Sequence, residues 1–289
     1  MAVEGVGVTS VAVAAARALE ASRPDSLVTD PWAAALVERS GVQTPFPTEW
    51  PSEPASLPAW DRSMLLGASY IGLRTRFIDD RLLADPLPQV VTLGSGLDTR
   101  AWRLDWPEGT TVFELDSAEV IALVDSVLAS CDARLGCRRV AVAADVTAPW
   151  AATIVAQGFI PSQPTHWVLE GLLPYLSAHD QASVLDDVIH LSAPGSAAVI
   201  ERAPALEDTP ETRERLRELA LATGMPMDEV LALTSPPDPA AMLSAAGWVV
   251  SDLTVADLER RYRRPLSAGS PADSKGRGGF VIAQRPPRD

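Results

Sequence analysis

The sequence predicts an α/β fold of the Rossmann-like type, with a seven-stranded, mostly parallel sheet and helices on both of its faces. Three observations support this prediction. Short apolar runs alternate with helical stretches along the 289 residues, a glycine turn follows the first run, and polar residues end the first four runs at Gly94, Asp116, Asp145 and Glu170. Ligands in such sheets bind outside the carboxyl ends of the strands. We therefore expect a single domain with a ligand site along that edge.

The stretch 89–116 predicts the centre of this site, because it reads as a strand, a glycine turn, a helix and a second strand. Residues 90–93 are mostly apolar and β-branched, which suits a strand buried on both faces. Gly94 and Gly96 allow a sharp turn and a close ligand approach, and the following helix N-terminus adds partial positive charge. Asp116 follows about 20 residues later, where an acid accepts hydrogen bonds from ribose hydroxyls. The stretch therefore indicates a nucleoside site.

The residues after Gly96 favour S-adenosylmethionine over a dinucleotide, but only weakly. Thr99 stands where a dinucleotide fingerprint has a third small residue. Asp98 would repel the phosphates of a dinucleotide, whereas S-adenosylmethionine carries none. The pattern taken alone also fits a glycine turn with an incidental aspartate, so these alternatives stay open at this point.

Helical spacing predicts a first helix over residues 9–22, with Arg17 and Glu20 on its polar side. Its apolar face consists of small and branched residues, namely Val11, Ala14, Ala15, Ala18 and Leu19. A second helix is expected from Asp30 as N-cap to Gly41 as C-terminal stop. The proline-rich segment 41–60 predicts either a lid or binding loop or a disordered loop.

Asp61 is the expected cap of the next helix, which extends to Asp85 and whose charges, such as Asp79 and Asp80, typically form a solvated face. The elements after the glycine turn are expected in this order: a helix over 118–130, strands over 140–144 and 166–169, a helix over 177–191, a strand over 196–200, helices around 211–216 and 228–233, a helix over 238–246, and strands over 248–254 and 280–284. Because the alternation lapses over 204–239, we interpret that segment as an insertion over the carboxyl edge of the sheet.

The composition of the chain limits the classes of partner that it is expected to bind. The net charge is -14 and the pI is about 4.6, which disfavours nucleic-acid backbones and anionic membranes as partners. The N-terminus lacks the basic region of a secretion signal, and no apolar run is long enough to span a bilayer, so a cytoplasmic location is expected. Cys131 and Cys137 lack a second pair or a histidine cluster. Free thiols and no metal site are therefore expected.

Several motifs together carry a resemblance to a known family. They are VVTLGSGLDTRAWRL, VFELD, AADV and WVLEGLLPYLS, with TDPWAAAL and RTRFIDD upstream. These motifs resemble the S-adenosylmethionine-dependent methyltransferases related to leucine carboxyl methyltransferase, in the bacterial branch that includes O-methyltransferases. The likeness covers roughly residues 10–203 in order. It implies the class I methyltransferase form of the Rossmann-like fold, a helical lid, and S-adenosyl-L-methionine as the cofactor.

The resemblance also implies roles for single residues. Asp116 would accept hydrogen bonds from the ribose hydroxyls, while Asp145 and Val146 would meet the adenine. Glu170 would face the ammonium group of the cofactor, and Arg74 would pair with its carboxylate. The methionine part would lie against the turn residues Gly94, Ser95 and Gly96. A basic residue of the first helix also contacts the cofactor in this family, and here the candidate is Arg17.

The expected organisation follows the same resemblance. The single domain, 1–289, would consist of an N-terminal helical lid and cofactor-carboxylate segment (1–86), a cofactor-binding core (87–203), a helical insertion over the acceptor site (204–239) and C-terminal strands (240–289). The expected function is O-methyl transfer to a carboxylate or hydroxyl of a small molecule, in secondary metabolism. The alternatives are a methyltransferase acting on a protein C-terminal carboxylate, a nucleotide-binding oxidoreductase, and a noncatalytic binding protein.

No residue is assigned as a catalytic base. Methyl transfer from a sulfonium depends mainly on alignment and on exclusion of water, and a carboxylate acceptor needs no base, whereas a hydroxyl acceptor benefits from one. His166 and His190 are expected to be structural. His179 and Tyr175 follow the strand that ends at Glu170 and are within possible reach of an acceptor. The tryptophans Trp32, Trp50 and Trp60 either line the acceptor pocket or pack in the core.

Overall fold

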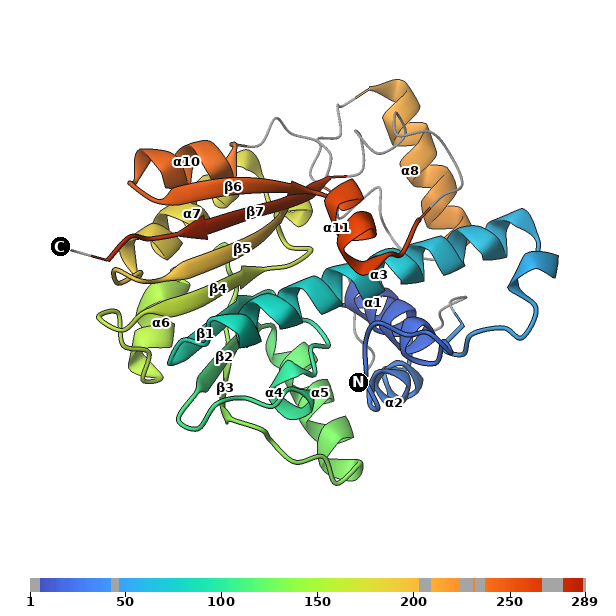
Figure 1. Ribbon diagram of the computed structural model, residues 1–289, viewed down its shortest axis with the longest axis horizontal. Coiled ribbons are helices and arrows are strands. Elements are labelled where there is room, and N and C mark those ends of the chain that lie inside the picture. Colours follow the sequence, from blue (N-terminus) through green and yellow to red (C-terminus); the bar gives the residue numbers. More distant parts are fainter. Residues whose placement is uncertain are drawn as a thin grey trace.

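The computed structural model describes residues 6–42, 47–202, 209–223, 231, 237–266 and 278–287. Seven strands form one sheet in the order β3-β2-β1-β4-β5-β7-β6, flanked by helices (Figure 1). The strands are β1 (Gln89–Leu93), β2 (Thr111–Asp116), β3 (Arg138–Ala143), β4 (Thr165–Leu169), β5 (Ala197–Arg202), β6 (Val249–Thr254) and β7 (Gly279–Gln284). Only β7 runs antiparallel to its neighbours, β5 and β6. The predicted α/β class with a mostly parallel, seven-stranded sheet is confirmed.

The alternation of side chains along β1 explains why this strand lies at the centre of the molecule. Val91 and Leu93 pack into the core on one face of the sheet, whereas Val90 packs into the core on the other face. In the register of the sheet, Leu93 pairs with Leu115 of β2, and Val91 pairs with Trp167 of β4. The carboxyl ends of β1, β2 and β4 therefore meet at one edge.

The described helices are α1 (Val6–Ala21), α2 (Ala33–Arg39), α3 (Ala59–Ala84), α4 (Arg100–Arg103), α5 (Ala118–Ser130), α6 (Trp150–Ala156), α7 (Ala178–His190), α8 (Pro210–Thr223), α10 (Pro239–Ala245) and α11 (Val255–Tyr262), with short 3-10 turns η1 (Pro54–Ser56) and η2 (Leu173–Tyr175). Figure 1 shows α3 and α11 in front of the sheet and α6, α7 and α10 behind it, which matches the two cores. A third apolar cluster joins α1, α2 and α5 beside the sheet.

Helix starts follow local capping chemistry. The hydroxyl of Ser177 accepts a hydrogen bond from the backbone N–H of Asp180 at the start of α7, and Asp238 caps α10 in the same way through Ala240. Both starts agree with the sequence. The predicted cap of α3 is wrong, because α3 begins at Ala59 and Asp61 lies inside its first turn.

Two short helices, α6 and α11, are absent from the sequence-based prediction. The second predicted insertion helix, around 228–233, falls almost wholly outside the described residues, while the first corresponds to α8. Among the described helices, none combines the length and the apolar character needed to cross a bilayer.

Burial around α1 differs from the amphipathic helix that the sequence predicts. The expected apolar face is buried, from Val11 at 0% exposure to Leu19 at 2%. Arg17 and Glu20, expected on a polar side, are buried as well. Glu20 forms an ion pair with Arg264 at 3.2 Å and accepts a hydrogen bond from the backbone N–H of Leu27. Residues distant in the sequence thus compensate charged side chains that the helical periodicity of the sequence places on the solvent-facing side.

Candidate functional site

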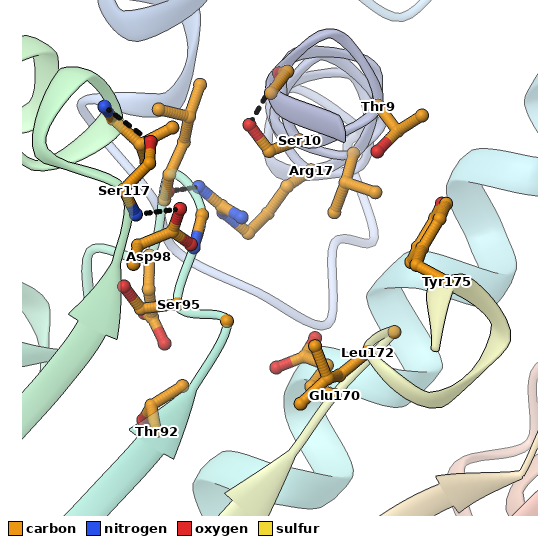
Figure 2. A pocket seen from close by; sticks show the side chains of 18 of the residues that line it. Thr9, Ser10, Arg17, Thr92, Ser95, Asp98, Ser117, Glu170, Leu172 and Tyr175 are labelled. Carbon is orange, nitrogen blue, oxygen red and sulfur yellow. Dashed lines mark hydrogen bonds between the residues drawn. The ribbon is translucent and has the colours of Figure 1, made fainter. Parts of the chain in front are cut away.

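A cavity of about 280 Å³ lies at the carboxyl edge of β1, β2 and β4, where the sequence predicts a ligand site. Figure 2 shows Thr9, Ser10 and Arg17 projecting from α1 on one side, with Glu170, Leu172 and Tyr175 across from them. The lining residues are Gly7, Thr9, Ser10, Val13 and Arg17 of α1, Arg74 of α3, Thr92, Gly94, Ser95, Gly96, Leu97, Asp98 and Arg100 around the glycine turn, Asp116, Ser117 and Val120 after β2, and Glu170, Gly171, Leu172 and Tyr175 after β4. Three neighbouring strand ends and α1 therefore enclose one site.

The glycine turn forms a cradle that side chains would fill. Gly94 and Gly96 have φ of 64° and 53°, in the left-handed region that other residues rarely adopt. A Cβ atom on Gly94 would lie 2.9 Å from Cδ1 of Leu172, and one on Gly96 would lie 3.0 Å from Cβ of Ser10. The backbone conformation thus favours glycine at both positions, and a side chain at either would displace Leu172 or Ser10. Both glycines line the cavity.

Asp116 ends β2 and points its carboxylate at the turn. Its Oδ2 accepts a hydrogen bond of 2.7 Å from the backbone N–H of Gly96, and its Oδ1 accepts one of 2.7 Å from the backbone N–H of Ser117. Burial raises the pKa of Asp116, and the two hydrogen bonds oppose that rise. The carboxylate is therefore fixed in orientation while it remains on the cavity wall.

Glu170 and Arg74 form the opposite, charged wall. Nε of Arg74 lies 2.8 Å from Oε1 of Glu170, and Nη1 of Arg74 donates to Glu201 at 2.8 Å. Glu201 also accepts a hydrogen bond from the hydroxyl of Tyr70. Burial acts to raise the pKa of Glu170, but Arg100 and Arg74 outweigh it and lower that pKa to about 2. Glu170 is thus an anion at every physiological pH.

The ion pair between Arg74 and Glu170 leaves one donor poorly satisfied. Nε of Arg74 is buried and makes no aligned hydrogen bond within the described residues, despite its proximity to Glu170. Because Nε is buried against Glu170, other atoms of Arg74 form its part of the cavity wall.

Arg17 reaches the site from α1. Its Nε pairs with Oδ2 of Asp30 at 2.6 Å, and its Nη2 donates to the carbonyl of Leu97 in the glycine turn at 2.6 Å. Asp30 also accepts hydrogen bonds from the backbone N–H groups of Trp32 and Ala33 at the start of α2. One arginine therefore ties α1 to the turn and to the start of α2, and it lines the cavity as well.

Arg100 is a cavity residue that the sequence reasoning missed. Its guanidinium lies 2.7 Å from each of Asp79, Asp98 and Glu170. Asp79, expected to be solvated, is buried at 6% exposure because Arg100 and Arg103 both pair with it. Asp98 pairs with the same Arg100. Its charge therefore repels an anion less than an unpaired aspartate in this turn would. The available signal was an arginine directly after the glycine turn, within reach of several acids.

Asp145 and Val146 are not among the residues that line this cavity. Asp145 is exposed, and its Oδ1 accepts hydrogen bonds from the backbone N–H and the hydroxyl of Thr147. Val146 packs against the core beside the sheet. Their expected contact with an adenine stays a prediction.

Two of the tryptophans pack in the protein rather than in the cavity. Trp32 belongs to the apolar cluster of α1, α2 and α5, and Trp50 packs near α1 and α3 with Arg23 over its ring at 4.5 Å. The side chain of Trp60 lies outside the described ones. The core alternative for Trp32 and Trp50 is thus the one that the structure supports.

The histidines and cysteines lie outside this cavity too. His166 is buried and its Nε2 lies 2.7 Å from the carbonyl oxygen of Asp85, which agrees with the expected structural role. His179 is exposed to solvent. Cys131 and Cys137 are free thiols. Among the described residues, no three His, Cys, Asp or Glu side chains are grouped as a metal site. Tyr175 lines the cavity, as its position after β4 suggested.

Comparison with known proteins identifies relatives along most of the chain. The model of the family described as leucine carboxyl methyltransferase matches residues 10–189. A protein of Saccharopolyspora erythraea named as an S-adenosyl-L-methionine-dependent methyltransferase is 40% identical over 287 residues, covering 98% of this chain and 96% of its own. A protein of Streptomyces coelicolor with the same designation is 39% identical, covering 98% and 94%.

A solved structure shares the fold at lower identity. The crystal structure of a DUF574 family protein from Streptomyces avermitilis has a TM-score of 0.50 and 13% identity, and the match covers 87% of this chain and 96% of that one. At this identity the likeness concerns the fold alone.

Proposed function

Because this chain belongs to the leucine carboxyl methyltransferase family and is an S-adenosylmethionine-dependent methyltransferase, we propose that it methylates a carboxylate or hydroxyl oxygen of a small molecule. The observation that carries the proposal is the cavity, in which a glycine cradle and Asp116 face Glu170 and Arg74. Because the family consists of methyltransferases, membership in it argues against the alternative that this chain is a nucleotide-binding oxidoreductase. The bacterial O-methyltransferase branch that the sequence resembles supports a secondary metabolite as the acceptor.

The residues of the cavity fit S-adenosyl-L-methionine. The turn residues Gly94, Ser95 and Gly96 line the cavity, and the absence of side chains on the two glycines would let the methionine part approach the backbone of the turn. The fixed carboxylate of Asp116 would accept from the ribose hydroxyls. Asp145 and Val146, after the adjacent strand β3, would complete the site at the adenine.

The charged wall fits the amino acid end of the cofactor. Arg74, which lines the cavity, would pair with the carboxylate. Glu170, an anion with a pKa of about 2, would accept the ammonium group. Arg17 holds α1 against the glycine turn and contributes a second cation beside the site.

The bound cofactor supplies an electrophilic methyl group on a sulfonium. The protein contributes alignment and exclusion of water, and such positioning lowers barriers by several kcal/mol, with about 7–11 kcal/mol as the upper range for well-oriented reactants. α1 covers one side of the cavity with Ser10 and Val13. We assign the remaining cover over the acceptor to the segment 204–239 and to the N-terminal segment 1–86.

The described lining of the cavity offers few groups that could act as a general base for the acceptor. Among the described lining residues there is no histidine, lysine or cysteine, and Tyr175 is the single phenol. A carboxylate attacks without a general base, whereas an aliphatic hydroxyl must lose a proton. A carboxylic acid is therefore the first acceptor class to test, and a hydroxyl compound is the second.

The test uses the purified protein, S-adenosylmethionine labelled in its methyl group, separate panels of small carboxylic acids, hydroxyl compounds and C-terminal peptides, and the small-molecule fraction of a cell extract. Methyl esters release labelled methanol in base, whereas methyl ethers do not, so base treatment separates the two small-molecule classes. Label in an acid or hydroxyl compound supports the proposal. Label in peptides alone, or in no acceptor from cell extracts despite cofactor binding, would overturn it.

A further inference from the structure

A single guanidinium joins the glycine turn to the charged wall of the cavity. Arg100 begins α4 directly after the turn. Its Nη1 donates to Glu170 after β4 and to Asp98 within the turn, and its Nε donates to Asp79 of α3, each at 2.7 Å. Its backbone N–H also donates to Asp98 at 2.7 Å. Three separate segments of the chain therefore meet at this one side chain.

This junction is buried and strongly ionic. The side chain of Arg100 is 6% exposed, and those of its three acidic partners are 12% exposed or less. Three arginines (Arg74, Arg100, Arg103) and four acids (Asp79, Asp98, Glu170, Glu201) are linked by these pairs. The group thus carries one excess negative charge, and two of its acids, Asp98 and Glu170, line the cavity. Such a wall suits a cationic ligand group.

We propose that Arg100 is a positioning residue for the amino acid end of the cofactor, holding Glu170 in the orientation and charge state that receive the ammonium group. This inference rests on the proposed function, because it assigns Glu170 to that group. Planar guanidinium forks hold carboxylates with defined geometry, which a lysine cannot reproduce. Arg100 would act through Glu170, whereas Arg74 would contact the cofactor itself.

Arg103 provides a matched control. It pairs with the same Asp79 through two contacts of 2.5 and 2.8 Å and is similarly buried, with a side-chain exposure of 5%. It neither lines the cavity nor contacts Glu170 in the described contacts. Loss of Arg103 therefore removes a buried arginine from the same ionic group without releasing Glu170.

The experiment measures dissociation constants by calorimetry for S-adenosylhomocysteine, which has the amino acid end, and for 5′-methylthioadenosine, which lacks it. Wild type is compared with Arg100→Met, Arg100→Lys and Arg103→Met. For Arg100→Met we expect the Kd of S-adenosylhomocysteine to rise about tenfold or more, as for loss of an oriented charged contact. The Kd of methylthioadenosine should stay within about threefold, as should both constants for Arg103→Met.

A pH series supplies a second readout. In wild type, Glu170 stays ionised from pH 5 to 8, because two arginines hold its pKa near 2. Without Arg100 the pKa of Glu170 rises, so its protonated fraction grows as the pH falls. The affinity of Arg100→Met for S-adenosylhomocysteine should therefore weaken towards pH 5 relative to wild type. Arg100→Lys keeps a positive charge and should show an intermediate Kd with a flatter pH series, which preserves the test if Arg100→Met does not fold.

The outcomes separate the two proposals. If wild type binds neither ligand, the proposed function fails. If wild type binds both ligands equally, the ammonium group gains nothing from Glu170 and the inference about Arg100 is wrong, although the nucleoside site stands. Equal losses for the two ligands in the Arg100 variants, or equal losses of S-adenosylhomocysteine in Arg100→Met and Arg103→Met, would reduce Arg100 to a structural residue.

Discussion

Gly96→Ala should separate the backbone requirement of the glycine turn from its role in binding. Gly96 has φ of 53°, and an added Cβ would lie 3.0 Å from Cβ of Ser10 in α1. Gly247 offers a matched control, because its φ is 82° but a Cβ there would meet nothing within 4 Å. Both substitutions impose left-handed strain, and only one also introduces a side chain at the cavity wall.

The magnitudes follow from these geometries. An alanine in the left-handed region costs roughly 1–2 kcal/mol, which corresponds to a fall in the unfolding temperature of about 2–8 °C for either variant. Carbon atoms prefer separations of about 3.5–4.0 Å, so in Gly96→Ala the turn must also move away from Ser10. That movement displaces the N–H of residue 96 from Asp116, now at 2.7 Å. Loss of this hydrogen bond to a charged group costs about 1.5–3 kcal/mol of folding stability. Because Asp116 is then no longer held at the cavity wall, binding of the cofactor should weaken as well.

Calorimetry with S-adenosylmethionine and thermal unfolding together test this reasoning. We expect a lower unfolding temperature for Gly96→Ala than for Gly247→Ala, and weakened binding only for Gly96→Ala. Adding Ser10→Gly removes the Cβ that the alanine meets, so the double variant should regain much of the lost affinity. Wild-type affinity in Gly96→Ala, or no recovery in the double variant, would refute the proposed contact.

Three further predictions concern single side chains. Asp116→Asn keeps the size of the side chain but loses its charge. The Kd for S-adenosylmethionine, measured by calorimetry, should therefore rise about tenfold or more. An unchanged Kd would show that Asp116 does not contact the cofactor. Burial raises the pKa of Glu114 from 4.5 to about 7, although its ion pair with Arg139 opposes the rise. The stability that the neutral form of Glu114 provides is therefore complete below pH 4.5 and is lost as the pH rises through 7. In denaturant titrations from pH 4 to 8, wild type should therefore lose stability relative to Glu114→Gln, and parallel curves would contradict the shift. Tyr175→Phe should leave cofactor affinity within about threefold but lower methyl transfer in the radiochemical assay if the acceptor lies beside this hydroxyl, and full activity would place the acceptor elsewhere.

The strands that build the candidate site are predictable because their signals are local. The mostly β-branched residues 90–93 and the apolar run 111–115 predict buried strands from composition, and they correspond closely to β1 and β2. Gly94, Gly96 and Asp116 follow from their spacing, since a turn needs glycine where φ is positive. These residues do line the cavity.

The ionic wall of the site is not predictable in the same way, because its partners lie far apart in the sequence. Arg74 pairs with Glu201 across 127 positions, and Arg17 donates to Leu97 across 80. Helical period assigned Glu20 and Asp79 to solvent, whereas tertiary partners bury both. The helices α6 and α11 were missed because each is short, with seven and eight residues, and short helices owe their stability to packing rather than to a readable period.

The placement of the tryptophans determines what fluorescence can report about this protein. Trp150, Trp167 and Trp248 lie in the core behind the sheet, and no tryptophan is among the described residues that line the cavity. Direct stacking of a bound ligand on these three indoles is therefore not the source of any change in their emission. In a variant that keeps only these three tryptophans, a shift of the emission maximum on addition of S-adenosylmethionine would instead record a rearrangement transmitted through the protein. An unchanged spectrum alongside calorimetric binding would indicate that the core around these indoles does not rearrange.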